Sequence, residues 1–473
     1  MSVTSDTGSR TGSPSGSQSG ARSGAQAGQR PGIAGWISYR TATVRRAMER
    51  PLTSYYLLLG GSTMLLAIGL MMVLSASSVY SFKVHDSSYY IFLKQLSWVI
   101  IGLPAAYLAS RMNRRLLRLL AWPAVLVAVV LLALTQTSLG VVVNGNRNWL
   151  AVGPFTVQPS EIAKLAIVLW TADVYAKKEK YLDNPWHALI PVAPVVVLIS
   201  GLVVLQHDLG TALVLFAILL GMLWVVGVPA RLFGIALSLV GVVAFYLAAS
   251  SPERRTRLTS FIDPFKDFQG DGWQAGHGLL GMSSGGIFGK GLSASQQKWG
   301  SLPEAHTDFI FAVIGEELGL IGTLLVLALF GAVAFAAIRL AINTADPFVR
   351  YVSAGVTIWL MSQMIINTGM VLALLPVIGI PLPLVSYGGS ALVPSMVALG
   401  LLVGFARAEP EAAAALRDRR GERRPGKKGS GKKGSGKKRP GRMSLPGAIS
   451  AGSARARARS GSKPAGSARS RRG

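Results

Sequence analysis

Ten apolar stretches determine what this chain can fold into. A helix needs about 20 residues to cross the hydrocarbon core of a bilayer, and stretches of about that length recur between residues 55 and 407. Half of the residues are hydrophobic and only 15% are charged. The sequence therefore predicts an all-α integral membrane protein with about ten transmembrane helices. The predicted spans are approximately 55–78, 90–110, 115–137, 160–177, 187–205, 208–227, 229–250, 309–340, 347–375 and 389–407.

Basic residues in short loops favour the cytoplasmic side of a membrane. A cytoplasmic N-terminus places most basic loop residues inside, and an even number of spans returns the C-terminus to the same side. We expect a multi-pass protein of the cytoplasmic membrane with both termini in the cytoplasm. Two large loops, 138–159 and 251–308, are then extracytoplasmic, the second between the seventh and eighth spans. Together with the basic tail, the basic residues assigned to the cytoplasm are Arg45, Arg46, Arg50, Arg111, Arg114, Arg115, Lys177, Lys178, Lys180, Arg231, Arg339 and Arg350.

The formal charge of +27 belongs mainly to the two ends of the chain. Residues 407–473 hold 21 Lys and Arg against 4 Asp and Glu, and residues 1–50 hold 7 against 2, so these ends carry +22. The membrane-embedded body has no basic excess that would indicate nucleic acid binding. We predict a disordered cytoplasmic tail at 1–50, a membrane domain at 51–408 and a disordered basic cytoplasmic tail at 409–473. The basic tail is either a solvated arm or a segment attracted to anionic lipids.

Several common functional motifs are excluded. The chain has no cysteine, which rules out disulfides, thiolate metal sites and thiol nucleophiles. Residues 276–281 match GxGxxG, but no strand-turn-helix context surrounds them. The sequence GGIFGKGLS around Lys290 resembles a phosphate-binding loop, yet Gly291 stands where that motif requires Ser or Thr.

Asp308 is the strongest candidate for a catalytic base. It lies with Glu304 and His306 in a polar stretch that runs into the apolar segment beginning at Phe309. Ionisable residues at a membrane boundary indicate chemistry or transport, whereas a lone Asp before a helix can also be an N-cap. The next carboxylates, Glu316 and Glu317, are either structural hydrogen-bonding groups or a proton or cation site.

Lys164 and Arg147 are candidate cations for a lipid-linked phosphate, because both types of side chain form charge-assisted bonds with such oxygens. For Lys164, two alternatives remain: it extends to the membrane surface, or it forms an ion pair with Glu161 one turn earlier. Asp208 begins a predicted span, where a carboxylate caps a helix and complements its dipole.

Four long motifs occur in order along the chain. They are NGNRNWLAVGPFTVQPSEIAKLAIV, QHDLGTALVLF, the run from GDGWQAGHGLLGMSSGGIFGKGL to KWGSLPEAHTDFIFAVIGEELG, and PVIGIPLPLVSYGGS. Through them the sequence resembles the SEDS family (shape, elongation, division and sporulation), and its division members more than its elongation members, which tend to carry a basic residue at the position of Ala305. His207, Asn148 and Ala391 depart from the family pattern.

The resemblance implies a peptidoglycan glycosyltransferase that polymerises lipid II outside the cytoplasmic membrane at the division septum. It implies a class B penicillin-binding protein and other division proteins as partners, with no nucleic acid. The essential acidic residue of the family falls on Asp308, and a divalent cation, Mg²⁺ or Mn²⁺, is a further candidate to stabilise the leaving pyrophosphate. A transporter of lipid II and a non-catalytic division scaffold are the alternatives. The candidate substrate-binding residues are Arg147, Glu161, Lys164, Lys290, Lys298, Glu304, His306, Thr307 and Ser386.

Overall fold

The structure is a computed structural model that describes residues 51–143, 146–153, 155–250, 261, 263–270 and 272–422. The predicted disorder of residues 1–50 and of residues 423–473 concerns segments outside this described part.

Ten long helices correspond one by one to the ten predicted spans. Within the described residues, nine helices are long and apolar enough to cross a membrane. The tenth, α5, carries more charge and is mostly buried among the others. The predicted all-α membrane fold is therefore confirmed. The ten helices are α2 (Thr53–His85), α3 (Tyr90–Arg111), α4 (Arg114–Leu134), α5 (Pro159–Lys178), α6 (Pro185–Leu205), α7 (Leu209–Val226), α8 (Ala230–Ala249), α11 (Ile310–Asn343), α12 (Pro347–Val371) and α13 (Leu392–Ala408).

Both predicted outer loops contain regular structure. The first forms a small antiparallel sheet in the order β1-β2-β3, in which Val141 pairs with Trp149 and Ala151 with Thr156. The described part of the second contains a helix, α10, and a short 3-10 helix, η2. The remaining elements are β1 (Gly140–Val143), β2 (Asn146–Val152), β3 (Phe155–Val157), η1 (Glu179–Tyr181), α10 (Trp273–Ser284), η2 (Gln297–Trp299), η3 (Gly389–Ala391) and α14 (Pro410–Glu422).

The structure differs from the prediction just after residue 408. The predicted disordered tail starts at residue 409, but Pro410–Glu422 form helix α14. The sequence EAAAALRDRR explains this, because Ala, Glu, Leu and Arg are strong helix formers even where no apolar face is buried.

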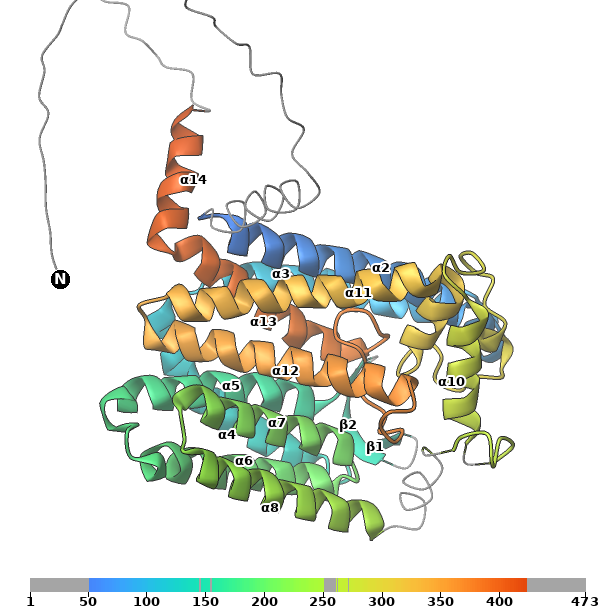
Figure 1. Ribbon diagram of the computed structural model, residues 1–473, viewed down its shortest axis with the longest axis horizontal. Helices are drawn as coiled ribbons and strands as arrows, with labels where there is room; N and C mark the ends of the chain where they lie inside the picture. The colour runs from blue at the N-terminus through green and yellow to red at the C-terminus, as the bar shows by residue number, and fades with distance from the viewer. Residues whose placement is uncertain are drawn as a thin grey trace, which may run out of the picture. The chain divides into compact units, whose positions relative to one another are not determined.

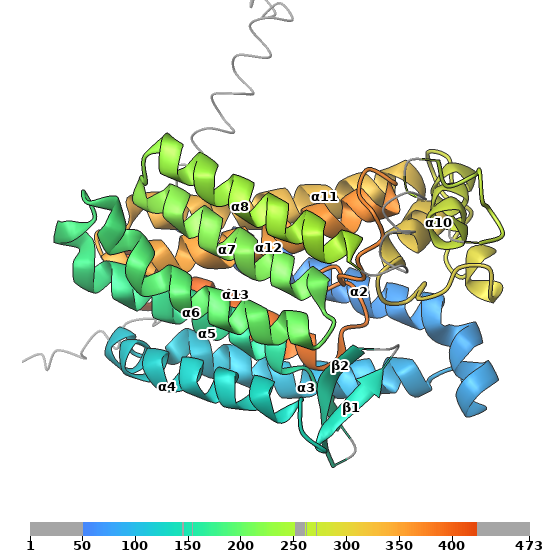
Figure 2. The same ribbon diagram turned by 90° about the horizontal axis from the view of Figure 1, so that it is seen from below.

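The long helices run alongside one another (Figures 1 and 2). α13 packs against α3, α11 against α2, and α12 against α5, α7 and α11. The sheet and α10 lie at the same end of this bundle in both views, and we call it the loop end. The opposite end, where α11 connects to α12, is called the basic end.

Ion pairs join the helix connections at the basic end. Arg114 on α4 contacts Asp346, the N-cap of α12, at 2.9 Å, and Arg350 contacts Glu179 at 3.1 Å. The buried carboxylate of Asp173 pairs with Arg118 at 2.8 Å. Several of the basic loop residues that the sequence assigns to the cytoplasmic side therefore lie at one end of the bundle.

The predicted role of Asp208 as a helix cap is confirmed. Asp208 is the N-cap of α7, and its carboxylate accepts a hydrogen bond from the Thr211 backbone at 2.9 Å. It thereby satisfies one of the free N–H groups at the helix start.

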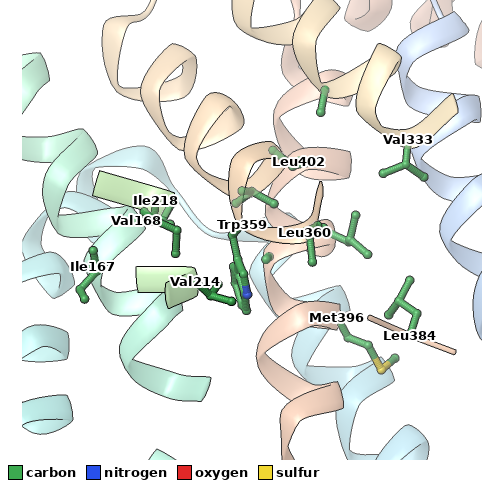
Figure 3. Packing of buried hydrophobic residues seen from close by; sticks show 14 of the residues in the cluster. Ile167, Val168, Val214, Ile218, Val333, Trp359, Leu360, Leu384, Met396 and Leu402 are labelled. Atoms are coloured by element: carbon green, nitrogen blue, oxygen red, sulfur yellow. The ribbon is translucent and has the colours of Figure 1, made fainter. Parts of the chain in front are cut away.

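Trp359 lies at the centre of the core. Its indole ring, on α12, faces Val168 of α5 and Val214 of α7, while Leu360 and Leu402 pack on the other side of α12 (Figure 3). Trp359 is fully buried, and α12 packs against α5 and α7 as well as against α11.

We expect Trp359→Ala to lower the free energy of unfolding by about 3–5 kcal/mol, because truncating a buried aromatic residue leaves a cavity. Thermal denaturation of the purified protein in detergent measures the change. Trp186→Ala is the matched control, since this tryptophan on α6 is 54% exposed. Equal melting temperatures for the two variants would contradict the central role of Trp359.

Candidate functional site

A tight turn fixes the loop that carries Asp308. The Glu304 carbonyl accepts hydrogen bonds from the backbone N–H of Thr307 at 3.1 Å and of Phe309 at 3.2 Å. The Thr307 hydroxyl donates to the Glu304 carboxylate at 2.6 Å. Glu304 has a φ of 55°, a left-handed conformation that is uncommon for a non-glycine residue. The turn therefore sets the direction of the chain directly before α11.

Asp308 is held by the end of α12 and by the segment that follows it. The Asn367 side chain donates to the Asp308 backbone carbonyl at 2.8 Å and to the Ile380 carbonyl at 2.7 Å. The carboxylate lies beside Gly379, where an added Cβ would be 3.2 Å from Oδ2. Asp308 is partly exposed, and the N-cap of α11 is Phe309, without a side-chain cap. Asp308 thus lies one residue before the N-cap position of α11.

His306 packs between two tyrosines. Its ring centroid is 5.4 Å from that of Tyr80 and 5.6 Å from that of Tyr387, and the Tyr387 N–H donates to the His306 carbonyl at 2.9 Å. Burial lowers the pKa of His306, while the Glu304 carboxylate acts in the opposite direction. Burial thus favours a neutral imidazole beside Asp308.

Glu161 and Lys164 form a buried ion pair on α5, with Lys164 Nζ 2.7 Å from Glu161 Oε1. Lys164 is only 1% exposed, so the alternative in which it extends to the membrane surface is wrong and the ion pair is confirmed. Its ammonium also lies 5.6 Å from the centre of the Trp359 ring, a favourable position for a cation.

A small cavity of about 20 Å³, partly open to solvent, has Glu161 of this ion pair in its wall. Glu161, Gln363, Ser386 and Ser395 supply polar groups to its wall, and residues 381–384 supply apolar ones. The Ser386 hydroxyl accepts a hydrogen bond from the Leu382 N–H at 2.7 Å. Glu161 and Ser386, which are far apart in the sequence, therefore meet in one cavity.

Arg147 lies on β2, where its Nη2 atom donates to the Thr137 carbonyl at 3.0 Å, next to the end of α4. Its neighbour Asn148 departs from the family pattern, yet it donates to the Asp208 carboxylate at 3.0 Å. Gln158 donates to the same oxygen at 3.1 Å. The sheet is thus attached to the start of α7 and to the start of α5.

Lys290 and Lys298 are both engaged by the carboxylates of α11. Lys290 Nζ lies 2.9 Å from Glu316 Oε1, and Lys298 Nζ lies 3.2 Å from Glu317 Oε1. Ser75 of α2 donates to Glu317 at 2.6 Å. Both glutamates are fully buried. Their ion pairs and hydrogen bonds agree with the structural role, one of the two alternatives that the sequence left open.

One segment, residues 376–391, connects the candidates. It contacts Asp308 through Gly379, His306 through Tyr387, and lines the cavity of Glu161 through Ser386. The segment thus lies beside a partly exposed carboxylate, which can take up a proton, and beside a small cavity whose wall includes Glu161, the partner of the buried Lys164 ammonium.

The sequence-based search missed Asn367 and Gln363. Both are polar residues inside the predicted span 347–375, and a polar residue within a span is a signal for function. The sequence does not show that Asn367 bonds to Asp308 or that Gln363 lines the cavity, because both contacts join distant parts of the chain.

No group of three or more His, Cys, Asp or Glu side chains that could hold a metal ion occurs in the part of the chain that the structure describes.

Comparison with known proteins confirms the resemblance found in the sequence. The model of the FtsW, RodA and SpoVE family, described as cell cycle protein, matches residues 56–410. FtsW of Mycobacterium tuberculosis, named as a probable peptidoglycan glycosyltransferase, is 40% identical over 377 residues, which cover 80% of this chain and 72% of the relative. Stage V sporulation protein E of Bacillus subtilis is 36% identical over 348 residues, covering 73% and 94%.

Solved structures show the same fold. A chain from a peptidoglycan synthase complex superposes with a TM-score of 0.61 at 28% identity, covering 74% of this chain and 96% of that one. RodA of Thermus thermophilus superposes with a TM-score of 0.55 at 30% identity, covering 75% and 97%. The relatives include several FtsW proteins at 35 to 40% identity, which agrees with the predicted similarity to division members. This multi-pass membrane protein belongs to the SEDS family of FtsW, RodA and SpoVE, and is most like FtsW.

Proposed function

We propose that this chain is a peptidoglycan glycosyltransferase that polymerises lipid II into β-1,4 glycan strands, with Asp308 as the general base. The observation that carries the proposal is the position of Asp308. Its carboxylate is partly exposed at the loop end, and its backbone is bound by Asn367. The segment beside it also lines the small cavity that Glu161 and Ser386 border. FtsW relatives are named as probable peptidoglycan glycosyltransferases, and this supports the reaction class.

In the proposed reaction, the acceptor sugar's 4-hydroxyl oxygen attacks the anomeric carbon of the donor. The hydroxyl proton passes to the Asp308 carboxylate as the new C–O bond forms, and the bond from the anomeric carbon to pyrophosphate breaks with its electron pair. A direct displacement inverts the anomeric centre and converts an α-linked donor into a β-linked glycan. The pyrophosphate leaves unprotonated, so one carboxylate is sufficient. A positioned base accelerates such a step by about 10²- to 10⁴-fold.

Lys164 is the proposed cation for the departing pyrophosphate, with Glu161 holding its ammonium beside the cavity. Preorganised charge in a site that excludes water stabilises developing negative charge strongly. Arg147, Ser386 and the Glu304–Thr307 turn are proposed to bind the remainder of the substrate at the loop end. Lys290 and Lys298 form ion pairs with α11, so they contribute mainly by holding the segment that contains them.

The charge pattern supports the proposed orientation. Arg114, Arg118 and Arg350 lie at the basic end of the bundle, and basic residues favour the cytoplasm. The loop end with Asp308 then faces outward, and both termini are cytoplasmic. A septal location and a class B penicillin-binding protein as partner are further parts of the proposal. The similarity to a chain of a synthase complex that coordinates polymerisation and crosslinking supports such a partner.

A lipid II transporter is the second candidate, and the deep carboxylates Glu316 and Glu317 were the observation in its favour. Each of them pairs with a lysine and with a serine hydroxyl. A proton-coupled or cation-coupled carrier needs carboxylates that release their partners, and this network favours a fixed structural role instead.

We expect Asp308→Asn to reduce lipid II polymerisation by at least about 10²-fold, because the amide cannot accept the proton. The measurement is glycan chain formation by the purified protein with its transpeptidase partner. Asp263→Asn is the matched control, since this aspartate is exposed and its carboxylate accepts a hydrogen bond from the nearby Phe265 N–H. Full activity of Asp308→Asn would refute the assignment of the base.

A double variant separates the catalytic role of Lys164 from a structural one. Lys164→Met alone leaves the Glu161 carboxylate buried without its ion pair, a change that typically costs about 3–5 kcal/mol. Glu161→Gln combined with Lys164→Met removes both charges and is expected to recover most of the melting temperature. Turnover is expected to stay low in the double variant, because the pyrophosphate still lacks its cation. Recovery of turnover together with stability would show that the pair is only structural.

The divalent cation is proposed to arrive with the substrate phosphates, since the described residues contain no acidic or histidine cluster to hold it. We expect EDTA to lower turnover and Mg²⁺ or Mn²⁺ to restore it, with no change in the melting temperature of the protein alone. A melting temperature that falls with EDTA would instead indicate a metal bound by the protein.

A further inference from the structure

Helix α11 is broken at Gly319, where φ is 68° and ψ is −164°. A break in a helix frees backbone groups that need other partners. Here residues 286–291 supply them: the N–H groups of Lys290 and Gly291 donate to the carbonyls of Glu316 and Glu317, each at 3.0 Å. Below the break, the Leu320 N–H donates to Gly286 at 2.9 Å and the Ile321 N–H donates to Ile287 at 3.2 Å. The segment therefore runs along α11 as a backbone-bonded partner.

Two glycines allow this close approach. A Cβ at Gly289 would lie 2.2 Å from the Glu317 carbonyl oxygen, and one at Gly319 would lie 2.4 Å from the Gly289 nitrogen. Both residues have positive φ, a conformation that glycine adopts without steric cost. The Lys290–Glu316 ion pair adds a side-chain bond to the same junction.

The apolar side chains of this segment are exposed. Phe288 is 81% exposed, and Ile287 and Leu292 are more than half exposed. They continue the exposed apolar surface of Leu320 and Ile321, which begin the apolar part of α11 below the break. Trp299, also exposed, lies nearby with its carbonyl bonded to Lys83 of α2. An apolar surface of this kind, rimmed by Trp and Lys, is typical of a membrane interface.

The position of the break along α11 fits the edge of a bilayer. The helix has 34 residues, about 51 Å at 1.5 Å per residue, whereas the hydrocarbon core is about 30 Å thick. Gly319 lies 20 residues before Arg339, which is near the basic end. About 20 helical residues cross the hydrocarbon core, so Gly319 falls at its other edge. Non-helical backbone at membrane depth is tolerated where protein covers it, and the backbone hydrogen bonds of residues 286, 287, 290 and 291 to α11 attach this segment to the protein.

We propose that residues 286–292 form a re-entrant segment whose apolar side chains insert into the lipid at the loop end of the bundle. The occupant of this surface is the bilayer itself, because the surface is continuous with the lipid-facing side of α11. The segment anchors the upper part of α11, and with it the Asp308 turn, at the membrane surface. This inference concerns membrane insertion and does not depend on the proposed reaction.

The chain has no native cysteine, so a single nitroxide label at Phe288→Cys reports on one position. In proteoliposomes of the purified full chain, power saturation compares contact with oxygen, which concentrates in lipid, and with a water-soluble nickel chelate. Leu324→Cys on α11 is the lipid-facing control, and Ser283→Cys on α10 is the exposed polar control. We expect the label at 288 to resemble the one at 324, with at least a threefold lower nickel accessibility than at 283.

Nickel accessibility at 288 equal to that at 283 would overturn the proposal. Shielding that appears only after addition of a partner protein would also overturn it, because the surface would then be a protein interface. An unchanged melting temperature of each cysteine variant in detergent confirms that the label reports on the folded protein.

Discussion

The pairing of buried charges is the constraint on which the rest of this structure depends. A charge removed from water is tolerated when a partner and further hydrogen bonds compensate for the lost hydration. Glu161 with Lys164, Glu317 with Lys298, and Asp173 with Arg118 satisfy this condition. The last two pairs join different parts of the chain, so the need to pair a charge also determines which segments lie together. The Glu161–Lys164 pair places its cation next to a cavity.

Residues 376–391 contact several of the candidate site residues. The segment receives the Asn367 hydrogen bond at Ile380, lies against Asp308 at Gly379 and lines the cavity at Ser386. Asp308, the proposed base, lies in the turn before α11, and Glu161, the partner of Lys164, lies on α5, yet both lie beside this segment. A substrate that contacts this segment near Gly379 and Ser386 would lie beside Asp308 and beside the cavity wall that contains Glu161.

Many elements of the fold were predictable because they depend on local sequence. The ten spans follow from hydropathy and length, and their bounds agree with the helices to within several residues at most ends. The cap at Asp208 and the Glu161–Lys164 pair were also predictable, because they involve residues three positions apart. The helix at Pro410–Glu422 was missed because the basic composition of the tail obscured a short run of helix formers.

The sequence by itself determined the membrane class, the ten spans, the SEDS family and the choice of Asp308, because hydropathy and motifs are written in consecutive residues. Only the tertiary structure decided that Asn367 holds Asp308, that Ser386 meets Glu161, and that Lys290 and Lys298 are engaged by α11. The break at Gly319 and its pairing with residues 286–291 were also invisible in the sequence. The physical reason is that hydrogen bonds and ion pairs between distant residues depend on how the helices pack, and packing leaves no periodic signal in the chain.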